Sequence, residues 1–113
     1  MKERRRFIRA DTRFNVEYFL GGKSSSSQAS GARNISQGGV CLMFNERIDK
    51  DTEIGLKFYL PEFRSPVSCR GRVIWQNEVT ENNRKFYQTG IEFTEIEEAD
   101  KEKISKYIYV LLK

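Results

Sequence analysis

Apolar and polar residues alternate along several short segments of the chain, which is the pattern of half-buried β-strands. Phe14, Val16 and Tyr18 fall on one side of the first segment, and polar residues separate them. The alternation, with turn residues between segments, predicts six strands, at residues 13–20, 29–35, 39–44, 52–60, 67–76 and 85–93. Short strands joined by turns favour a mainly β fold, a small antiparallel six-stranded β-barrel.

The segment 67–76 is the longest apolar alternation, and it contains a glycine at its centre. Its in-phase residues are expected to face the core together: Val67, Cys69, Gly71, Val73 and Trp75. A glycine inside a strand often marks a bend or bulge, so we expect one at Gly71. The polar residues 77–83 then predict a hairpin connection to the last strand.

The C-terminal segment changes from a period of two to a helical period. Thr94 and Glu97 have the spacing of a capping box, so the helix is expected to span residues 95–112. Five apolar residues lie on one arc of the helical wheel: Ile104, Tyr107, Ile108, Leu111 and Leu112. A single C-terminal α-helix that packs on the strands explains this face.

The length of 113 residues fits one domain, residues 1–113. We divide it into a flexible basic arm at 1–11, the barrel at 12–93 and the helix at 95–112. No apolar run is long enough to span a membrane, and no signal peptide is recognisable, so we expect a cytoplasmic protein without membrane insertion. Residues 21–31, which contain four consecutive serines, are expected to form an exposed loop.

Composition argues against catalysis and against metal binding. The chain has no histidine and two distant cysteines, Cys41 and Cys69, which fit reduced core residues better than zinc ligands. No nucleophile lies beside a base in the sequence, so we expect no enzymatic activity, no metal and no cofactor. The net charge is +4, with basic residues concentrated in residues 2–13 and acidic residues in 95–102. The basic end is expected to meet an anion.

Two short motifs carry candidate binding chemistry. Arg5 and Arg9 lie four residues apart, and a guanidinium fork matches phosphate oxygens or the O6/N7 edge of guanine. Asn34, Ser36 and Gly39 lie in the polar link between two predicted strands, where they offer a carboxamide, a hydroxyl and an unhindered backbone. Taken separately, an arginine-rich terminus is commonly a solvated tail, and the second motif has the composition of an ordinary hairpin turn.

Together, Arg-x-x-x-Arg and Asn-x-Ser-x-x-Gly, in this order on this strand pattern, resemble the PilZ domain family. The later segments Gly71–Trp75 and Gln88–Phe93 resemble strands of that family, as does the terminal helix. The resemblance implies a β-barrel that binds the second messenger cyclic di-GMP. It implies ligand-binding roles for Arg5, Arg9, Asn34, Ser36 and Gly39, with Arg4, Arg6 and Gly38 as secondary candidates.

In the implied site, Arg5 and Arg9 pair with phosphate and guanine, while Asn34 and Ser36 bond guanine edges. The purine lies close to Gly39. The alternative register, Arg9 and Arg13, is less favoured because Arg13 belongs to the first predicted strand. Ordering of the arm on ligand binding would signal to a downstream protein partner that the sequence does not identify. Arg4 could help to hold a second, stacked ligand molecule, which would allow a ligand-linked homodimer.

Two other functions fit parts of the pattern. A basic β-barrel that binds single-stranded nucleic acid explains the charge and the aromatic residues, but it leaves the Asn-x-Ser-x-x-Gly turn unexplained. A PilZ-like barrel that binds only protein would not need the two motifs, so the presence of both argues against this function. Nucleic acid is therefore the alternative rather than the expected partner.

Overall fold

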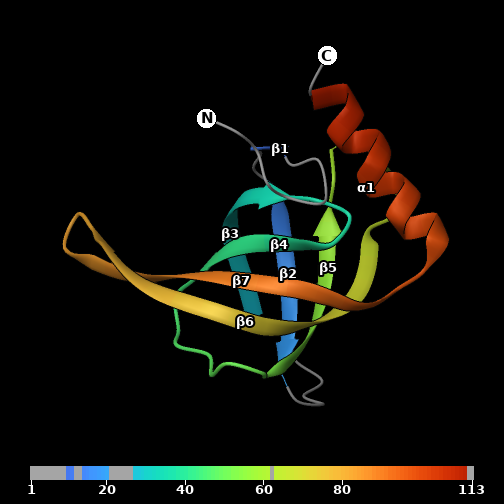
Figure 1. Ribbon diagram of the computed structural model, residues 1–113. Helices are drawn as coiled ribbons and strands as arrows, with labels where there is room; N and C mark the ends of the chain where they lie inside the picture. The colour runs from blue at the N-terminus through green and yellow to red at the C-terminus, as the bar shows by residue number, and fades with distance from the viewer. Residues whose placement is uncertain (1–9, 12–13, 21–26, 62, 112–113) are drawn as a thin grey trace, which may run out of the picture.

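The computed structural model describes residues 10–11, 14–20, 27–61 and 63–111. All seven strands in this part of the chain pair antiparallel, and one helix follows them (Figure 1). The elements are β1 (Ala10–Asp11), β2 (Asn15–Leu20), β3 (Ser27–Ile35), β4 (Gly39–Phe44), β5 (Glu53–Tyr59), β6 (Val67–Glu81), β7 (Arg84–Ile96) and α1 (Glu98–Leu111). The prediction of a mainly β antiparallel fold with a C-terminal helix is therefore confirmed.

The order of strands in the sheet is β1-β3-β2-β5-β6-β7-β4, and β3 also pairs with β4. The six predicted strands therefore form a ring of pairings, as a small barrel requires. The additional strand β1, which the sequence pattern did not predict, pairs Ala10 with Ile35 and Asp11 with Asn34. β1 lies within the last residues of the predicted arm, so these two residues have a fixed backbone partner.

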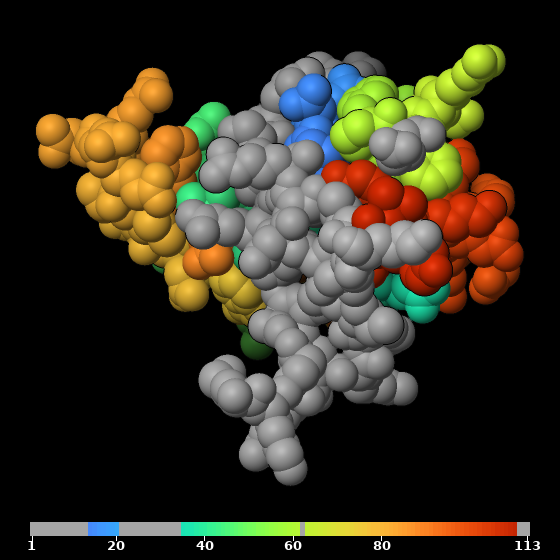
Figure 2. Space-filling model, turned by 90° about the horizontal axis from the view of Figure 1, so that it is seen from above, coloured from blue at the N-terminus to red at the C-terminus, as the bar shows by residue number. Residues whose placement is uncertain are grey.

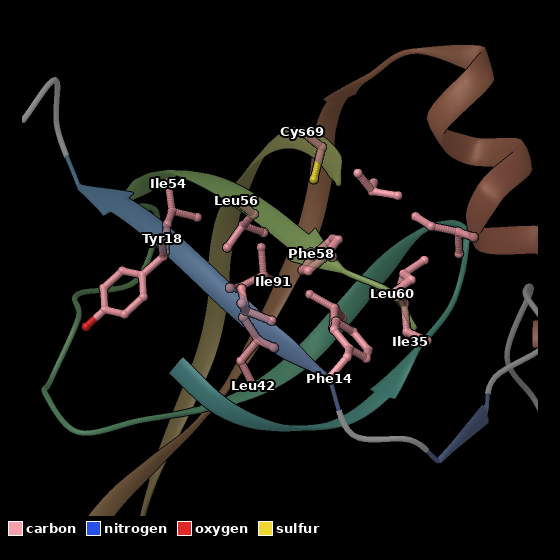
Figure 3. Close-up of a cluster of buried hydrophobic side chains, with 14 of the residues drawn as sticks. Phe14, Tyr18, Ile35, Leu42, Ile54, Leu56, Phe58, Leu60, Cys69 and Ile91 are labelled. Atoms are coloured by element: carbon pink, nitrogen blue, oxygen red, sulfur yellow. The ribbon is translucent and has the colours of Figure 1, made fainter. Parts of the chain in front are cut away.

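Alternating residues of the strands form one hydrophobic core. In β5, Ile54, Leu56 and Phe58 are buried while the residues between them are more exposed. Figure 3 shows Phe14, Phe58, Leu42 and Ile91 pointing into the same interior, and the rings of Phe14 and Phe58 meet edge to face at 5.4 Å. α1 adds Ile104, Tyr107 and Ile108 to this core, as its predicted apolar arc requires.

The two cysteines form no disulfide and are buried, as expected, but only one of them belongs to the main core cluster. Cys69 belongs to the core cluster, where burial, and secondly the charge of Asp100, raise the pKa of its thiol to about 12. The thiol therefore stays protonated and unreactive at neutral pH. In the part of the chain that is described, no helix has the length and apolarity needed to cross a membrane.

Two irregularities in the β6–β7 pairing set the direction of the β6 side chains. The register shifts between Arg70 and Gly71, since Arg70 lies opposite Glu95 and Gly71 lies opposite Phe93; an irregularity is thus present at the predicted place, but the extra residue is Thr94 of β7. The register shifts again between Val73 and Trp75, so that Ile74 has no opposite residue. This extra residue reverses the alternation, and Trp75 is 40% exposed on the outer face. The prediction that Trp75 shares the buried phase of Val73 is therefore wrong.

Strands β6 and β7 are longer than predicted. The expected hairpin connection at 77–83 is instead mostly strand, and the turn is only Asn82–Asn83. Both asparagines have positive φ, 51° and 64°, which suits the tight turns that match the twist of a hairpin. The hairpin extends beyond the other strands, and its end lies on the opposite side of the molecule from α1 (Figures 1 and 2).

The helix begins later than predicted. β7 continues to Ile96, with Glu95 opposite Arg70 and Ile96 opposite Cys69, so Thr94 cannot cap a helix. α1 starts at Glu98, and the carbonyl oxygen of Glu97 accepts the first helical hydrogen bonds from Asp100 and Lys101. The expected boundary at residue 95 is wrong because strand pairing competes successfully with the local capping signal.

Glycines allow β7 to pass very close to both of its neighbours. A Cβ atom at Gly39 in β4 would lie 2.3 Å from the carbonyl oxygen of Ile91, and its φ lies outside the left-handed region. A Cβ atom at Gly71 in β6 would lie 2.6 Å from Ile91 Cγ2 and 2.7 Å from the Glu92 carbonyl oxygen. Close approach to β7, rather than an unusual backbone angle, is therefore the reason for glycine at position 39.

Replacement of a buried aromatic ring should measure the contribution of the core. We expect Phe58→Ala to lower the free energy of unfolding by about 3–5 kcal/mol, because it leaves a cavity. The neighbouring Tyr59 is 42% exposed, so Tyr59→Ala should cost no more than about 1 kcal/mol. Urea denaturation of both variants provides the comparison, and equal losses would contradict the described orientation of β5.

Substitution of Gly39 should destabilise the fold even without any ligand. We expect Gly39→Ala to cost about 1–3 kcal/mol, because its methyl group would overlap the Ile91 carbonyl oxygen. Gly55→Ala is the matched control, since a Cβ atom there meets Phe19 at an ordinary 3.6 Å. Thermal unfolding should show a lower Tm for Gly39→Ala alone; a Tm equal to that of Gly55→Ala would refute the close contact.

Candidate functional site

The turn that joins β3 to β4 is held by its own serine. Ser36 N donates to Gly39 O at 2.9 Å, and Gly38 N donates to Ser36 Oγ at 3.1 Å. The Ser36 hydroxyl lies 3.4 Å from Gly39 O, to which it donates, and Ser36 is only 8% exposed. The hydroxyl therefore fixes the shape of the turn, a role that the sequence motif alone does not reveal.

The turn is connected to two other elements. Phe93 N donates to Gly38 O at 3.0 Å, which ties the turn to β7. The exposed Gln37 side chain donates through Nε2 to Ser105 Oγ on α1. A change in the turn can therefore reach the helix through a side chain as well as through β7.

Strand β1 brings the region of the first motif to the second. Ala10, which directly follows Arg9, lies opposite Ile35, and Asp11 lies opposite Asn34. The candidates Arg4, Arg5, Arg6 and Arg9 lie outside the described residues. The backbone of Asn34 is paired on both sides, with Asp11 and with Cys41.

The outer face of the neighbouring strands carries an exposed aromatic residue in register with Asn34. Strand pairing places Asn34 opposite Cys41, Cys41 opposite Gly90 and Gly90 opposite Trp75. The indole packs directly on Gly90, since a Cβ atom there would lie 2.3 Å from Trp75 Nε1 and Cε2. The 40% exposed ring is thus a supported flat surface, the kind on which nucleobases stack.

A second row on this face begins at Gly39 itself. Gly39 lies opposite Glu92, Glu92 opposite Arg72 and Arg72 opposite Glu53. Arg72 Nη2 donates to Glu92 Oε1 in an ion pair. This hydrogen bond, followed by the charge of Glu92, raises the pKa of Arg72 above its usual value, so the guanidinium remains charged.

Sequence reasoning singled out the turn but not Trp75, Arg72 or Glu92. Their place beside the turn follows from the strand register, which depends on the bulge at Ile74. The only sign of Trp75 in the sequence was a tryptophan followed by polar residues at the end of a predicted strand. Among the described residues, no group of three metal-binding side chains occurs.

Several solved structures have the same fold at low sequence identity. MotI/DgrA, an inhibitor of motility from Bacillus subtilis, is 18% identical with a TM-score of 0.78, covering 96% of this chain and 51% of that one. The PilZ domain of YcgR from Escherichia coli, solved with cyclic di-GMP, is 11% identical with a TM-score of 0.73, covering 97% and 92%. MrkH from K. pneumonia, in complex with cyclic di-GMP, is 19% identical with a TM-score of 0.76, covering 98% and 53%.

The chain therefore spans about half the length of MotI/DgrA and MrkH, and nearly all of the YcgR domain. No curated protein matches its sequence. A family model described as PilZ domain matches residues 3–110, which include both motifs. The resemblance inferred from those motifs is thereby confirmed, and the chain belongs to the PilZ domain family.

Proposed function

We propose that this PilZ domain is a cytoplasmic receptor for cyclic di-GMP, and that the ligand binds across the β3–β4 turn and the adjacent arm. PilZ domains are non-catalytic receptors of this dinucleotide, in agreement with the expectation that the chain is not an enzyme. YcgR and MrkH, which share the fold, were solved with cyclic di-GMP.

The pairing of β1 with β3 carries the proposal. It holds Ala10 opposite Ile35, one residue before Ser36. Arg9 is bonded to Ala10, and consecutive Cα atoms are about 3.8 Å apart, so we propose that Arg9 lies near the turn and that Arg5 extends to the same surface. In this proposal the two motifs, which lie 25 residues apart in the sequence from Arg9 to Asn34, meet at one binding site; a solvated tail beside an unrelated hairpin turn would not require the pairing of β1 with β3.

In this proposal the site residues have different tasks. Arg5 and Arg9 bind the phosphates and a guanine edge, with Arg4 and Arg6 as additional cations. Asn34 bonds a guanine edge, while Ser36 contributes mainly by holding the backbone of Gly38 and Gly39 in shape. Trp75, which was not among the sequence candidates, offers a stacking surface at the other end of the Asn34 row.

The proposed output is a change in the arm. Residues 1–11 act as the responsive part of a single domain, 1–113, and the ordered arm is presented to a downstream protein. A ligand bridge between two chains, with Arg4 on a second dinucleotide, would give a homodimer. The pairing of Ala10 and Asp11 with β3 supports the proposed ordering of the arm, because it fixes the end of the arm from which ordering would begin.

Calorimetric titration with cyclic di-GMP tests the proposal directly. We expect saturable binding, and a rise in the free energy of unfolding of about 2.7 kcal/mol at a ligand concentration of 100 times Kd. GMP and cyclic AMP should bind much more weakly. A melting curve unchanged by saturating cyclic di-GMP would count against the receptor function, and displacement of the ligand by single-stranded RNA would favour the nucleic-acid alternative.

The register of the arginine motif can be tested by two matched substitutions. We expect Arg9→Ala to weaken cyclic di-GMP binding by about 1.5–3 kcal/mol, the cost of one charge-assisted contact, or roughly ten- to a hundredfold in Kd. Arg13→Ala removes the same charge outside the preferred register and should have a much smaller effect. Calorimetric titration of both variants with cyclic di-GMP distinguishes the two registers, and equal losses of affinity would show that the chosen register is wrong.

A further inference from the structure

An ion pair lies beside the turn on the outer face and has no assigned task in the site. Glu92 is directly opposite Gly39, and Arg72 is directly opposite Glu92 on the next strand. Gly39 has no side chain, so nothing from that position stands between the Glu92 carboxylate and the turn. Both side chains remain accessible, with 40% of Glu92 and 48% of Arg72 exposed.

The same face presents Trp75 one row away. On β7, Glu92 and Gly90 are two residues apart and therefore point to the same side of the sheet. Trp75 covers Gly90, so the exposed ring and the carboxylate are neighbours on one surface. A flat aromatic surface with an acceptor group beside it suits a planar base with hydrogen-bond donors on its edge.

The carboxylate has the chemistry to identify that base. Guanine presents N1–H and an N2 amino group side by side, and a carboxylate accepts both with its two oxygens. Adenine presents an acceptor, N1, at the corresponding position and would be repelled. Arg72 donates to Oε1 of Glu92, and each carboxylate oxygen has a second acceptor site for a further donor.

We propose that Glu92 is a specificity residue that reads the donor edge of a guanine, and that Arg72 is the positioning residue that orients its carboxylate. The inference rests on the proposed cyclic di-GMP function and extends it. Arg72 has a second task, since its charge offsets that of Glu92 and allows a carboxylate to lie near a ligand with two phosphates. The charges of Asp51 and of Glu53, which lies opposite Arg72, also raise the pKa of Arg72, by less than Glu92 does.

The protein contains a matched control for this ion pair. Arg70 and Glu95 lie opposite each other on the same two strands and form a pair at 3.9 Å. Their side chains are 68% and 72% exposed, and β4 pairs with β7 only as far as Glu92, so Glu95 lies beyond the turn. Neutralisation of Glu95 removes the same negative charge from an ion pair on the same strands as neutralisation of Glu92, without affecting the proposed contact.

The experiment compares cyclic di-GMP with cyclic di-AMP as ligands of the wild type, Glu92→Gln and Glu95→Gln. We expect Glu92→Gln to lose about 5- to 150-fold in affinity for cyclic di-GMP, the discrimination typical of a bidentate contact to a base. Its affinity for cyclic di-AMP should stay the same or rise, so the ratio of the two dissociation constants falls. Glu95→Gln should keep the wild-type ratio.

Arg72 is tested by its conservative replacement. Arg72→Met should reduce the preference for the guanine dinucleotide, and Arg72→Lys should restore part of it, since a lysine can still hold the carboxylate. Unchanged preference in Glu92→Gln, in a protein that still binds cyclic di-GMP, would overturn the inference and leave the receptor function intact. Failure of the wild type to bind either dinucleotide would overturn both.

Discussion

The close passage of β7 between β4 and β6 is the constraint on which the rest of the structure depends. Gly39 on one side and Gly71 on the other leave no room for a Cβ atom next to Ile91 and Glu92. Ile91 thereby enters the core at 2% exposure, while Glu92 stays on the outer face beside the turn. One tight contact between strands thus places a core residue and a surface residue of the proposed site at once.

The same contact explains how the turn communicates with the end of the chain. Phe93 N, immediately after the tight segment, holds Gly38 O, and β7 then runs directly into α1. Gln37 reaches Ser105 on α1 from the other side of the turn. The turn is therefore connected to the helix through β7, to which it is hydrogen-bonded, and through the Gln37 side chain, so a ligand that reshapes the turn would act on both connections.

Much of this fold follows from the sequence, and the failures have identifiable causes. Alternation predicted the six strands, and Gly71 predicted the place of one irregularity in the β6–β7 pairing, because these signals are local. The bulge at Ile74 has no glycine to mark it, so the outward direction of Trp75 was missed, and pairing of Glu95 with Arg70 overrode a plausible capping box. For the candidate site, Asn34, Ser36 and Gly39 form a recognisable motif, whereas Glu92 and Arg72 are brought next to this motif only by the pairing of strands that are distant in the sequence.

β1 also bears on the energetics of the proposed switch. Ordering a residue costs roughly 1–2 kcal/mol of conformational entropy, so the ordering of residues 5–9 would cost about 5–10 kcal/mol. Charged hydrogen bonds from two arginines return only about 1.5–3 kcal/mol each. Ala10 and Asp11 already have partners in β3, so the entropy cost of ordering these two residues is not added to that of residues 5–9. In the proposed switch, two such contacts return about 3–6 kcal/mol together, which is below most of the range of about 5–10 kcal/mol, so contacts on the rigid strands are expected to supply the remainder.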